Sequence, residues 1–149
     1  TNVGFQTTFT GDGTSALQVF DVSFDLASGA FDQGIECEQI PVGATVVVNM
    51  RGGPAQAIRT YGSASLTALR SRLVWNFTTA TSVLLTGSAQ FAGSVVVASS
   101  SSVTTVQFPG MNGRLYTAGD LVHDSRVGAS GEEFHNYPFE GTLPSCPCT

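Results

Sequence analysis

Apolar and polar residues alternate along two stretches near the N-terminus, which is the pattern of half-buried β-strands. The first stretch spans residues 3–9 and the second spans residues 20–26, and the turn-forming sequence Gly11-Asp12-Gly13 lies between them. Two alternating runs on either side of such a turn are typical of neighbouring strands that bury one face. We therefore predict a pair of antiparallel strands at the N-terminus.

Short apolar runs bounded by Gly, Pro and polar residues continue through the middle of the chain. They predict further strands at residues 35–40, 44–50, 73–77 and 82–86. Runs of this length, separated by turn residues, indicate a protein built from β-strands.

One stretch, residues 63–73, has helical spacing instead. Leu66, Leu69 and Leu73 occupy positions i, i+3 and i+7. The stretch is short, so a single helix and an irregular strand are equally compatible with it. The predicted fold class is therefore all-β with at most one short helix.

Two segments of the second half repeat each other, FAGSVVVA at residues 91–98 and MNGRLYTA at residues 111–118. Each begins with a large apolar residue, has Gly two positions on, and continues as an apolar run that Ala closes. The copies lie about twenty residues apart, within the range of one coil of a stacked β structure. A unit this short cannot bury its apolar face alone, so we predict that successive coils lie on one another.

The chain of 149 residues is long enough for a single domain with its own core. Only 11% of the residues are charged, the net charge is −5, and all six cationic residues are Arg. Without a basic stripe, nucleic acid and anionic membrane surfaces are not expected as partners. No apolar run is long enough to insert into a membrane. A surface built from uncharged polar residues suits an extracellular protein.

Three cysteines occur, Cys37, Cys146 and Cys148. An odd number leaves one thiol over, or one bond to another chain. We predict a disulfide that ties the C-terminal tail to the strand around Cys37, with either tail cysteine as the partner, and a disulfide implies an oxidising compartment. A zinc site is disfavoured because the tail lacks a second pair of ligands at zinc spacing.

Glycosylation is a further expectation for an extracellular chain. Asn76-Phe77-Thr78 is a sequon, which makes Asn76 a candidate acceptor, although this residue also stands between two aromatic residues. The Ser run at residues 99–102 and the Thr patches at residues 78–81 and 104–105 suit either O-glycosylation or small polar residues on an outer face. Their spacing is too irregular to favour the Thr arrays of ice-binding solenoids.

Four segments carry a resemblance to a known family. They are LVWNFTTATSVLL at residues 73–85, SAQFAGSVVVASSSSV at 88–103, MNGRLYTAGDL at 111–121 and GEEFHNYPFEGTLP at 131–144. Together they resemble the C-terminal part of the choice-of-anchor A domain, an adhesin-like family of extracellular surface proteins. The resemblance implies a right-handed parallel β-helix-like solenoid and a role in extracellular adhesion or surface structure.

Two departures from the family pattern matter. Family members usually carry an additional N-terminal half of Gly-rich coils, and we expect this chain to correspond to the part after it, either as a processed fragment or as a shorter relative. Ala98 also leads into a Ser run, where an Ala-Pro-Asn step is common in the family. A solenoid open at its N-terminal end leaves a bare strand edge that must be capped or paired. This motivates the prediction that subunits stack end to end, or by their β-edges, into a fibre.

The closing motif is the most specific part of the resemblance. Its residues, for which a structural role is expected, are His135, Asn136, Tyr137, Pro138, Phe139, Gly141, Leu143 and Pro144. We expect the apolar Phe134, Tyr137 and Phe139 to cap the stack of coils. His135 and Asn136 would then satisfy backbone groups of the turn near Pro138.

Carboxylates and histidines gather in the last third of the chain, at Asp120, His123, Asp124, Glu132, Glu133 and His135. Such groups serve hydrolysis or metal binding in other proteins. Asp120 follows Gly119, however, and Asp in such turns bonds to its own backbone. The signatures of known nucleophile, nucleotide and zinc-protease sites are missing. We therefore expect no catalytic residue and no cofactor, with Asp120 and Asp124 as weak calcium candidates.

Trp75 has two interpretations, as a core residue beside Phe77 or as a sugar-binding residue, and the core is favoured. The chain is predicted to form one β-solenoid adhesin-like domain over residues 1–149, with residues 91–144 as its clearest coils and closing cap. The expected function is that of a non-enzymatic extracellular structural subunit that assembles with copies of itself. The alternative is a cell-surface adhesin module that binds carbohydrate or a matrix protein. An enzyme is disfavoured because the few charges are scattered.

Overall fold

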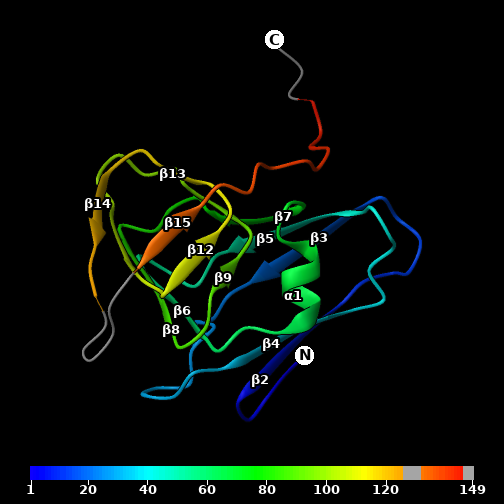
Figure 1. Ribbon diagram of the computed structural model, residues 1–149, viewed down its shortest axis with the longest axis horizontal. Coiled ribbons are helices and arrows are strands. Elements are labelled where there is room, and N and C mark those ends of the chain that lie inside the picture. Colours follow the sequence, from blue (N-terminus) through cyan, green and yellow to red (C-terminus); the bar gives the residue numbers. More distant parts are fainter. Residues whose placement is uncertain (126–131, 146–149) are drawn as a thin grey trace.

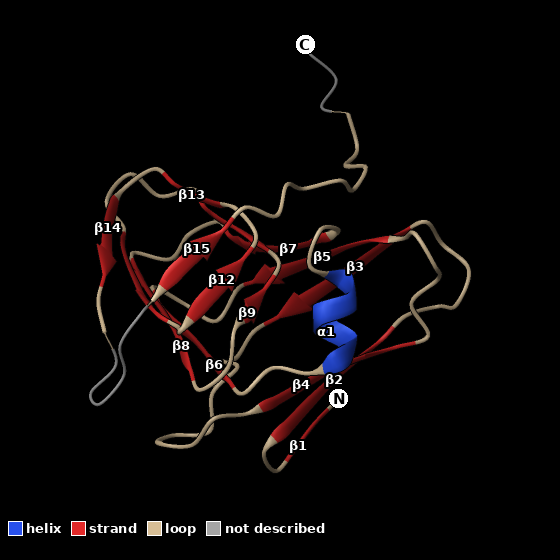
Figure 2. Ribbon diagram, in the orientation of Figure 1, coloured by secondary structure: helices blue, strands red, loops and turns tan. Residues whose placement is uncertain are grey.

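The computed structural model describes residues 1–125 and 132–145. This part of the chain consists mostly of β-strands, with one short helix (Figure 1 and Figure 2). Three of the four sheets formed by the described strands contain only parallel pairs. The predicted β-rich class with at most one short helix is therefore confirmed.

The three parallel sheets gather strands from distant parts of the sequence, and we call them the large, middle and small sheets. The large sheet has the order β13-β10-β7-β5-β3 and comprises β3 (Leu17–Val22), β5 (Thr45–Met50), β7 (Leu73–Phe77), β10 (Ser94–Val97) and β13 (Leu115–Thr117). The middle sheet has the order β14-β11-β8-β6 and comprises β6 (Ala55–Thr60), β8 (Ser82–Gly87), β11 (Val103–Gln107) and β14 (Asp120–His123). The small sheet has the order β15-β12-β9 and comprises β9 (Phe91–Ala92), β12 (Gly110–Asn112) and β15 (Glu133–His135).

From β7 onward the chain visits the large, middle and small sheets in turn, and it then repeats this order twice. Each strand consequently pairs with the strand of the preceding visit. Met111 lies opposite Phe91, and Leu115 lies opposite Val95. These pairs have the same offset as the two repeated sequence segments. The prediction that the repeated segments lie on one another is confirmed.

The helix α1 (Ala64–Leu69) precedes β7 in the chain, just as a small-sheet strand precedes β10 and β13. It packs against β9 and against β4 (Gly34–Glu38), so it lies beside the edge of the small sheet (Figure 2). Ser63 caps the helix by accepting a hydrogen bond from the backbone N–H of Leu66 at 3.1 Å, and Leu66 is buried. Residues 64–69 are therefore helical, and the alternative of an irregular strand is wrong.

Inward-facing side chains stand in rows across the large sheet. Val48, Trp75 and Val95 form one such row, and all three are fully buried. The indole Nε1 of Trp75 also donates a hydrogen bond of 2.9 Å to the carbonyl oxygen of Ala92 in β9. This bond joins the large sheet to the small sheet through the core. The prediction that Trp75 fills the core is confirmed.

The N-terminal strands pair differently from the prediction. β2 (Gln6–Thr10) pairs in parallel with β4, β3 pairs in parallel with β5, and an antiparallel pair joins β1 (Asn2–Val3) to β2. The predicted antiparallel pair across Gly11-Asp12-Gly13 is therefore wrong. Alternation identifies the buried face of a strand but not its partner. Here the loop after β2 carries the chain to another sheet instead of reversing it.

The Asp12 carboxylate organises this loop. It accepts hydrogen bonds from the backbone N–H groups of Thr14 and Ser15, each at 2.8 Å, and from the Gln18 side-chain amide at 2.7 Å. The Ser15 hydroxyl also donates to it. These bonds, with that of the Ser15 hydroxyl as the largest contribution, hold the pKa of Asp12 well below its ordinary value.

The Asp12 loop predicts a pH dependence of stability. Because the pKa of Asp12 is lower in the folded than in the unfolded chain, its contribution is complete above the unfolded pKa of roughly 3.9. It is lost progressively as the pH falls from that value through the folded-state pKa. Between pH 7 and pH 2 we expect the urea midpoint to fall less in Asp12→Asn than in the unmodified chain. Equal falls in the two proteins would contradict this role.

Only one of the three cysteines considered for the predicted disulfide, Cys37, lies within the described residues. Cys37 lies in β4, and its thiol forms no disulfide with another described residue. Burial, together with the neighbouring Glu36 carboxylate, raises the pKa of the Cys37 thiol to about 12. Cys146 and Cys148 lie outside the described residues, so the disulfide stays a prediction. Within residues 1–125 and 132–145, no helix has the length and apolar character needed to cross a membrane.

Candidate functional site

The closing segment does not follow the predicted path. The Arg70 guanidinium lies 4.5 Å from the centre of the Tyr137 ring, and the backbone N–H of Glu140 donates to the Ser71 carbonyl at 2.7 Å. The backbone N–H of Thr142 donates to the Thr45 hydroxyl at 2.8 Å. The segment after β15 therefore returns alongside the C-terminal end of α1 and the starts of β5 and β7 (Figure 1).

The expected cap of Phe134, Tyr137 and Phe139 is consequently wrong. Only Phe134 belongs to the last strand of the small sheet, and its side chain is 42% exposed. Tyr137 contacts Arg70 instead, and the Phe139 ring lies against Gly141. The remaining motif residues Leu143 and Pro144 are exposed. The motif closes back onto the chain beside α1, because its aromatic residues find partners there.

His135 and its neighbours form a chain of polar contacts across the small sheet, which we call the groove network. His135 Nδ1 lies 2.6 Å from Asn112 Oδ1, and its Nε2 lies 3.1 Å from a Glu133 carboxylate oxygen. The Asn112 amide donates to Gln90 Oε1 at 2.9 Å, and Asn112 is buried. Both ring nitrogens of His135 therefore lie beside side-chain oxygens. The turn-bonding role expected for His135 is replaced by this side-chain network.

A groove of about 570 Å³ separates the groove network from α1. Its lining residues are Tyr61, Gly62, Ser63, Ala64, Thr67, Ala68, Arg70, Ala89, Gln90 and Asn112. The groove exists because a helix stands beside the small sheet where the regular order of visits would place a strand (Figure 2). The hollow is open to solvent, and its volume lies within the range of small-molecule sites.

Arg70 forms the helix wall of the groove. One of its terminal nitrogens, Nη1, donates to the Thr67 carbonyl at 3.0 Å, and its guanidinium stacks on Tyr137. Its Nε is buried and has no hydrogen-bond partner. Among the described residues, no carboxylate side chain lines the groove, and none forms an ion pair with Arg70. Arg70 is therefore a cation that a carbonyl and an aromatic ring hold in place.

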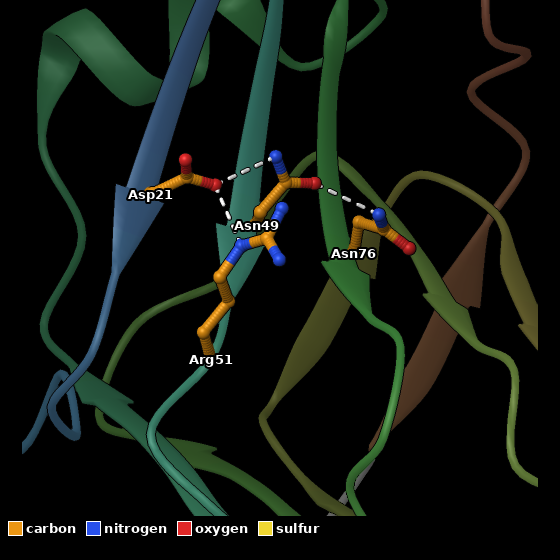
Figure 3. A network of polar contacts seen from close by, with 4 residues as sticks. All are labelled: Asp21, Asn49, Arg51 and Asn76. Atoms are coloured by element: carbon orange, nitrogen blue, oxygen red, sulfur yellow. Dashed lines mark hydrogen bonds and ion pairs between the residues drawn. The ribbon is translucent and has the colours of Figure 1, made fainter.

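Figure 3 shows a second polar arrangement, on the outer face of the large sheet, which we call the outer ladder. Asn76 donates to Asn49 at 2.8 Å, and Asn49 donates to Asp21 at 3.0 Å across three neighbouring strands. Arg51 donates to the same Asp21 oxygen at 2.8 Å. The bonds from Arg51 and then Asn49 lower the pKa of Asp21. This ladder fastens successive strands to one another.

The outer ladder also contains the predicted glycosylation acceptor. The side-chain nitrogen of Asn76 is the atom that donates to Asn49, and it is the atom to which an N-glycan would be attached. The side chain of the sequon asparagine is therefore already engaged in a hydrogen bond between neighbouring strands of the large sheet. Glycosylation of Asn76 stays a prediction.

The last visit of the chain to the three sheets leaves apolar side chains uncovered. Leu115, Leu121 and Phe134 continue inward rows whose earlier members are buried, and we call these three residues the open end. Leu121 is 46% exposed, and the three residues share a hollow of about 390 Å³. Among the described residues, no further strand covers this apolar end of the sheets.

The expected calcium ligands gain no support from the structure. Asp120 and Asp124 are both exposed, and a carboxylate oxygen of Asp124 accepts the backbone N–H of Ser125 at 2.8 Å. His123 lies edge-on to the Phe134 ring, with 4.8 Å between ring centres. Over residues 1–125 and 132–145, no group of three or more His, Cys, Asp or Glu side chains is placed to hold a metal ion.

The groove residues were not singled out as functional from the sequence. Asn112 offered one signal, because it stands at the position of the second repeat where the first has Ala92. A polar residue that replaces a small apolar one in a repeat indicates a local demand other than packing. The sequence around Arg70 contained no such signal, because the contact of Arg70 with Tyr137 depends on the path of the closing segment.

A family model described as "Putative Ice-binding-like adhesive domain" matches residues 1–135 of the chain. No curated protein and no solved structure matches the chain. The resemblance to the choice-of-anchor A domain is not confirmed, although the family that does match is likewise one of adhesive domains.

Proposed function

Because the chain belongs to this family of ice-binding-like adhesive domains, we propose that it is an extracellular surface domain that adheres to an external partner without catalysing a reaction. The family match over residues 1–135 is the observation that carries this proposal. The proposal that the domain catalyses no reaction is supported by the charged side chains, because several of the described ones form ion pairs that join neighbouring parts of the fold. Arg51 binds Asp21, and Arg59 binds Asp32 at 3.0 Å.

We propose further that the parallel sheets are the faces of one right-handed parallel β-helix-like solenoid, a single domain over residues 1–149. The cyclic visits to the three sheets support this architecture, because each visit adds one strand to every sheet. Parallel strands joined by crossovers are almost always connected with the right hand. On this interpretation α1 takes the place of one strand in one turn of the solenoid.

The partner proposed is an extracellular carbohydrate or matrix protein. Ice is disfavoured, because the outward row of the middle sheet reads Ala57, Leu84, Thr105 and Val122 and so contains a single Thr. Arrays of regularly spaced Thr are absent from that row.

The test is saturable binding of the full chain to immobilised extracellular polysaccharides and matrix proteins, measured by biolayer interferometry. We expect concentration-dependent binding to at least one surface, and no binding after heat unfolding of the chain. If the folded chain binds none of them, the adhesive function is wrong.

A second candidate function, end-to-end stacking of copies, is favoured by the open end. Its apolar side chains and the unpaired edges of β13 and β14 would be covered by another copy. We expect sedimentation velocity to show association that grows with concentration, and Leu121→Lys to abolish it. The matched control is Val42→Lys, since Val42 is a fully exposed apolar residue in the turn between β4 and β5. An unmodified chain that stays monomeric at every concentration would rule out stacking.

A further inference from the structure

We propose that the groove beside α1 binds a carboxylate-bearing sugar of an extracellular glycan, such as a uronic or sialic acid. This inference rests on the adhesive function proposed above, and it adds the place of binding and the chemical class of the ligand. Three observations carry it: the free polar groups of the groove, the unpaired Arg70, and the contacts that hold both walls.

The polar groups left free in the groove are mainly donors. Gln90 Oε1 already accepts from Asn112, so the Gln90 amide nitrogen is the free end of the groove network. Both polar atoms of the Asn112 side chain are engaged, by Gln90 and by His135. The Ser63 hydroxyl accepts from Leu66 and contacts the Ser65 hydroxyl, and the Thr67 hydroxyl donates to the Ser63 carbonyl, so neither hydroxyl supplies a free donor. The donors that remain for a ligand are the Gln90 amide nitrogen and the Arg70 guanidinium, and both suit a ligand that brings acceptors.

Arg70 indicates which acceptor is suited. Its guanidinium has no acidic partner, one nitrogen is fixed by the Thr67 carbonyl, and the plane is held by Tyr137. Because Nε is buried, a ligand can reach only the outer edge of the guanidinium formed by its two terminal nitrogens, and a cation fixed in this orientation suits a carboxylate oxygen. No carboxylate is among the described residues that line the groove, and the nearest one identified, that of Glu36, is engaged by the Ser65 hydroxyl behind Ser63.

The rest of the groove suits a sugar ring. Tyr61 lines it with 51% of its surface exposed, which leaves an aromatic side chain available to an apolar sugar face. The volume of about 570 Å³ lies within the range of small-molecule sites and is sufficient for a short stretch of glycan. Amide, guanidinium and aromatic groups together fit the mixed polar and apolar surface of an acidic saccharide.

The closing motif braces both walls at once. His135 contacts Asn112 on the sheet wall, and Tyr137, two residues later, contacts Arg70 on the helix wall. A backbone hydrogen bond of 2.9 Å from Tyr137 N–H to the His135 carbonyl fixes the distance between these two residues. The groove is therefore preorganised by the motif, which reduces the entropic cost of binding.

The test uses isothermal titration calorimetry of the full chain with trigalacturonate and with 3′-sialyllactose, the two sources of a sugar carboxylate. Carboxyl-reduced trigalacturonate and lactose are the matched neutral probes, and 3′-sulfolactose is the sulfated one. We expect one of the two acidic sugars to bind at least tenfold more tightly than its neutral counterpart. Arg70→Gln should lose at least tenfold in affinity for it.

The control is Arg51→Gln, which makes the same change of charge on the outer face of the large sheet and should alter affinity by less than twofold. Tyr137→Ala should weaken binding at least threefold, whereas Tyr137→Phe keeps the ring under Arg70 and should not. This pair separates positioning of the guanidinium from a loss of the tyrosine hydroxyl.

Several outcomes would overturn the inference. They are equal binding of acidic and neutral sugars, tighter binding of the sulfated sugar, or an Arg70→Gln variant with unchanged affinity. Binding of the chain to polysaccharide or matrix surfaces without any binding of the acidic sugars would sink the inference and leave the adhesive function standing. Binding to nothing at all would remove both.

Discussion

Replacing Gly113 with Ala is expected to lower the free energy of unfolding by about 3 kcal/mol. A β-carbon at position 113 would lie 2.1 Å from the carbonyl oxygen of Gly93, one repeat earlier in the chain. Gly93 and Gly113 both lie at the corner between the small and large sheets. The β-carbon would clash with a backbone atom, so no side chain can move aside to make room. The backbone segments of successive repeats would have to move apart at that corner.

Gly52→Ala is the matched control for this substitution. A β-carbon at Gly52 would meet the nearest backbone atoms of Phe24 at 3.5 Å, which is an ordinary contact. We expect it to change stability by less than about 0.5 kcal/mol. Urea unfolding followed by circular dichroism measures both variants. If Gly113→Ala were as stable as Gly52→Ala, the close stacking at the corner would be wrong.

Replacing Trp75 with Ala is expected to cost about 4 kcal/mol, the effect of removing a large buried aromatic side chain. Trp75 is fully buried between the rings of Phe9 and Phe91, whose centres lie 6.2 Å and 5.8 Å from it. Its removal leaves a cavity between the large and small sheets. It also leaves the Ala92 carbonyl without its donor.

Trp75→Phe separates these two contributions. The smaller ring retains part of the packing but cannot donate to Ala92, so we expect a loss of about 2 kcal/mol. Thermal unfolding followed by circular dichroism compares the two variants. A Trp75→Ala variant that unfolds at the temperature of the unmodified chain would contradict the placement of Trp75 in the core.

The repeat in the second half was the most informative feature of the sequence. Its two copies were predicted to lie on one another, and the structure explains the Gly that they share. At Gly113 a β-carbon would clash with the backbone of Gly93 in the preceding repeat, whereas Gly93 has a φ of +107° and a β-carbon there would meet the side chains of Leu73 and Trp75. A pattern with a steric cause of this kind is readable before the fold is known.

The N-terminal strands show why the same reasoning failed there. Within the predicted strand over residues 3–9, Thr7 and Phe9 are buried as expected, but Val3 and Phe5 on the same predicted face are exposed. The partner of the strand depends on the loop that the Asp12 carboxylate holds, and that loop leads to another sheet. Gly11-Asp12-Gly13 is compatible with a tight reversal and with a wider loop, and only tertiary contacts distinguish them.

The groove was beyond sequence reasoning for a related reason. Arg70 and Gln90 come from separate parts of the chain, and the closing segment had been expected to cover the end of the stack. Its aromatic residues were expected to pack on apolar side chains at the end of the stack, whereas Tyr137 contacts the Arg70 guanidinium beside α1. A contact between two side chains that lie far apart in the sequence produces no periodic pattern of apolar residues from which it could be predicted.

The most direct test of the account is a chemical-shift titration of the uniformly ¹⁵N-labelled chain with trigalacturonate and 3′-sialyllactose. The account predicts that the backbone amides of Arg70 and Asn112 and the side-chain amide of Gln90 shift with a common saturation curve. Signals of Asn49 and Asn76 in the outer ladder should stay in place. Shifts confined to the open end around Leu121, or to the outer ladder, would place binding elsewhere and contradict the account.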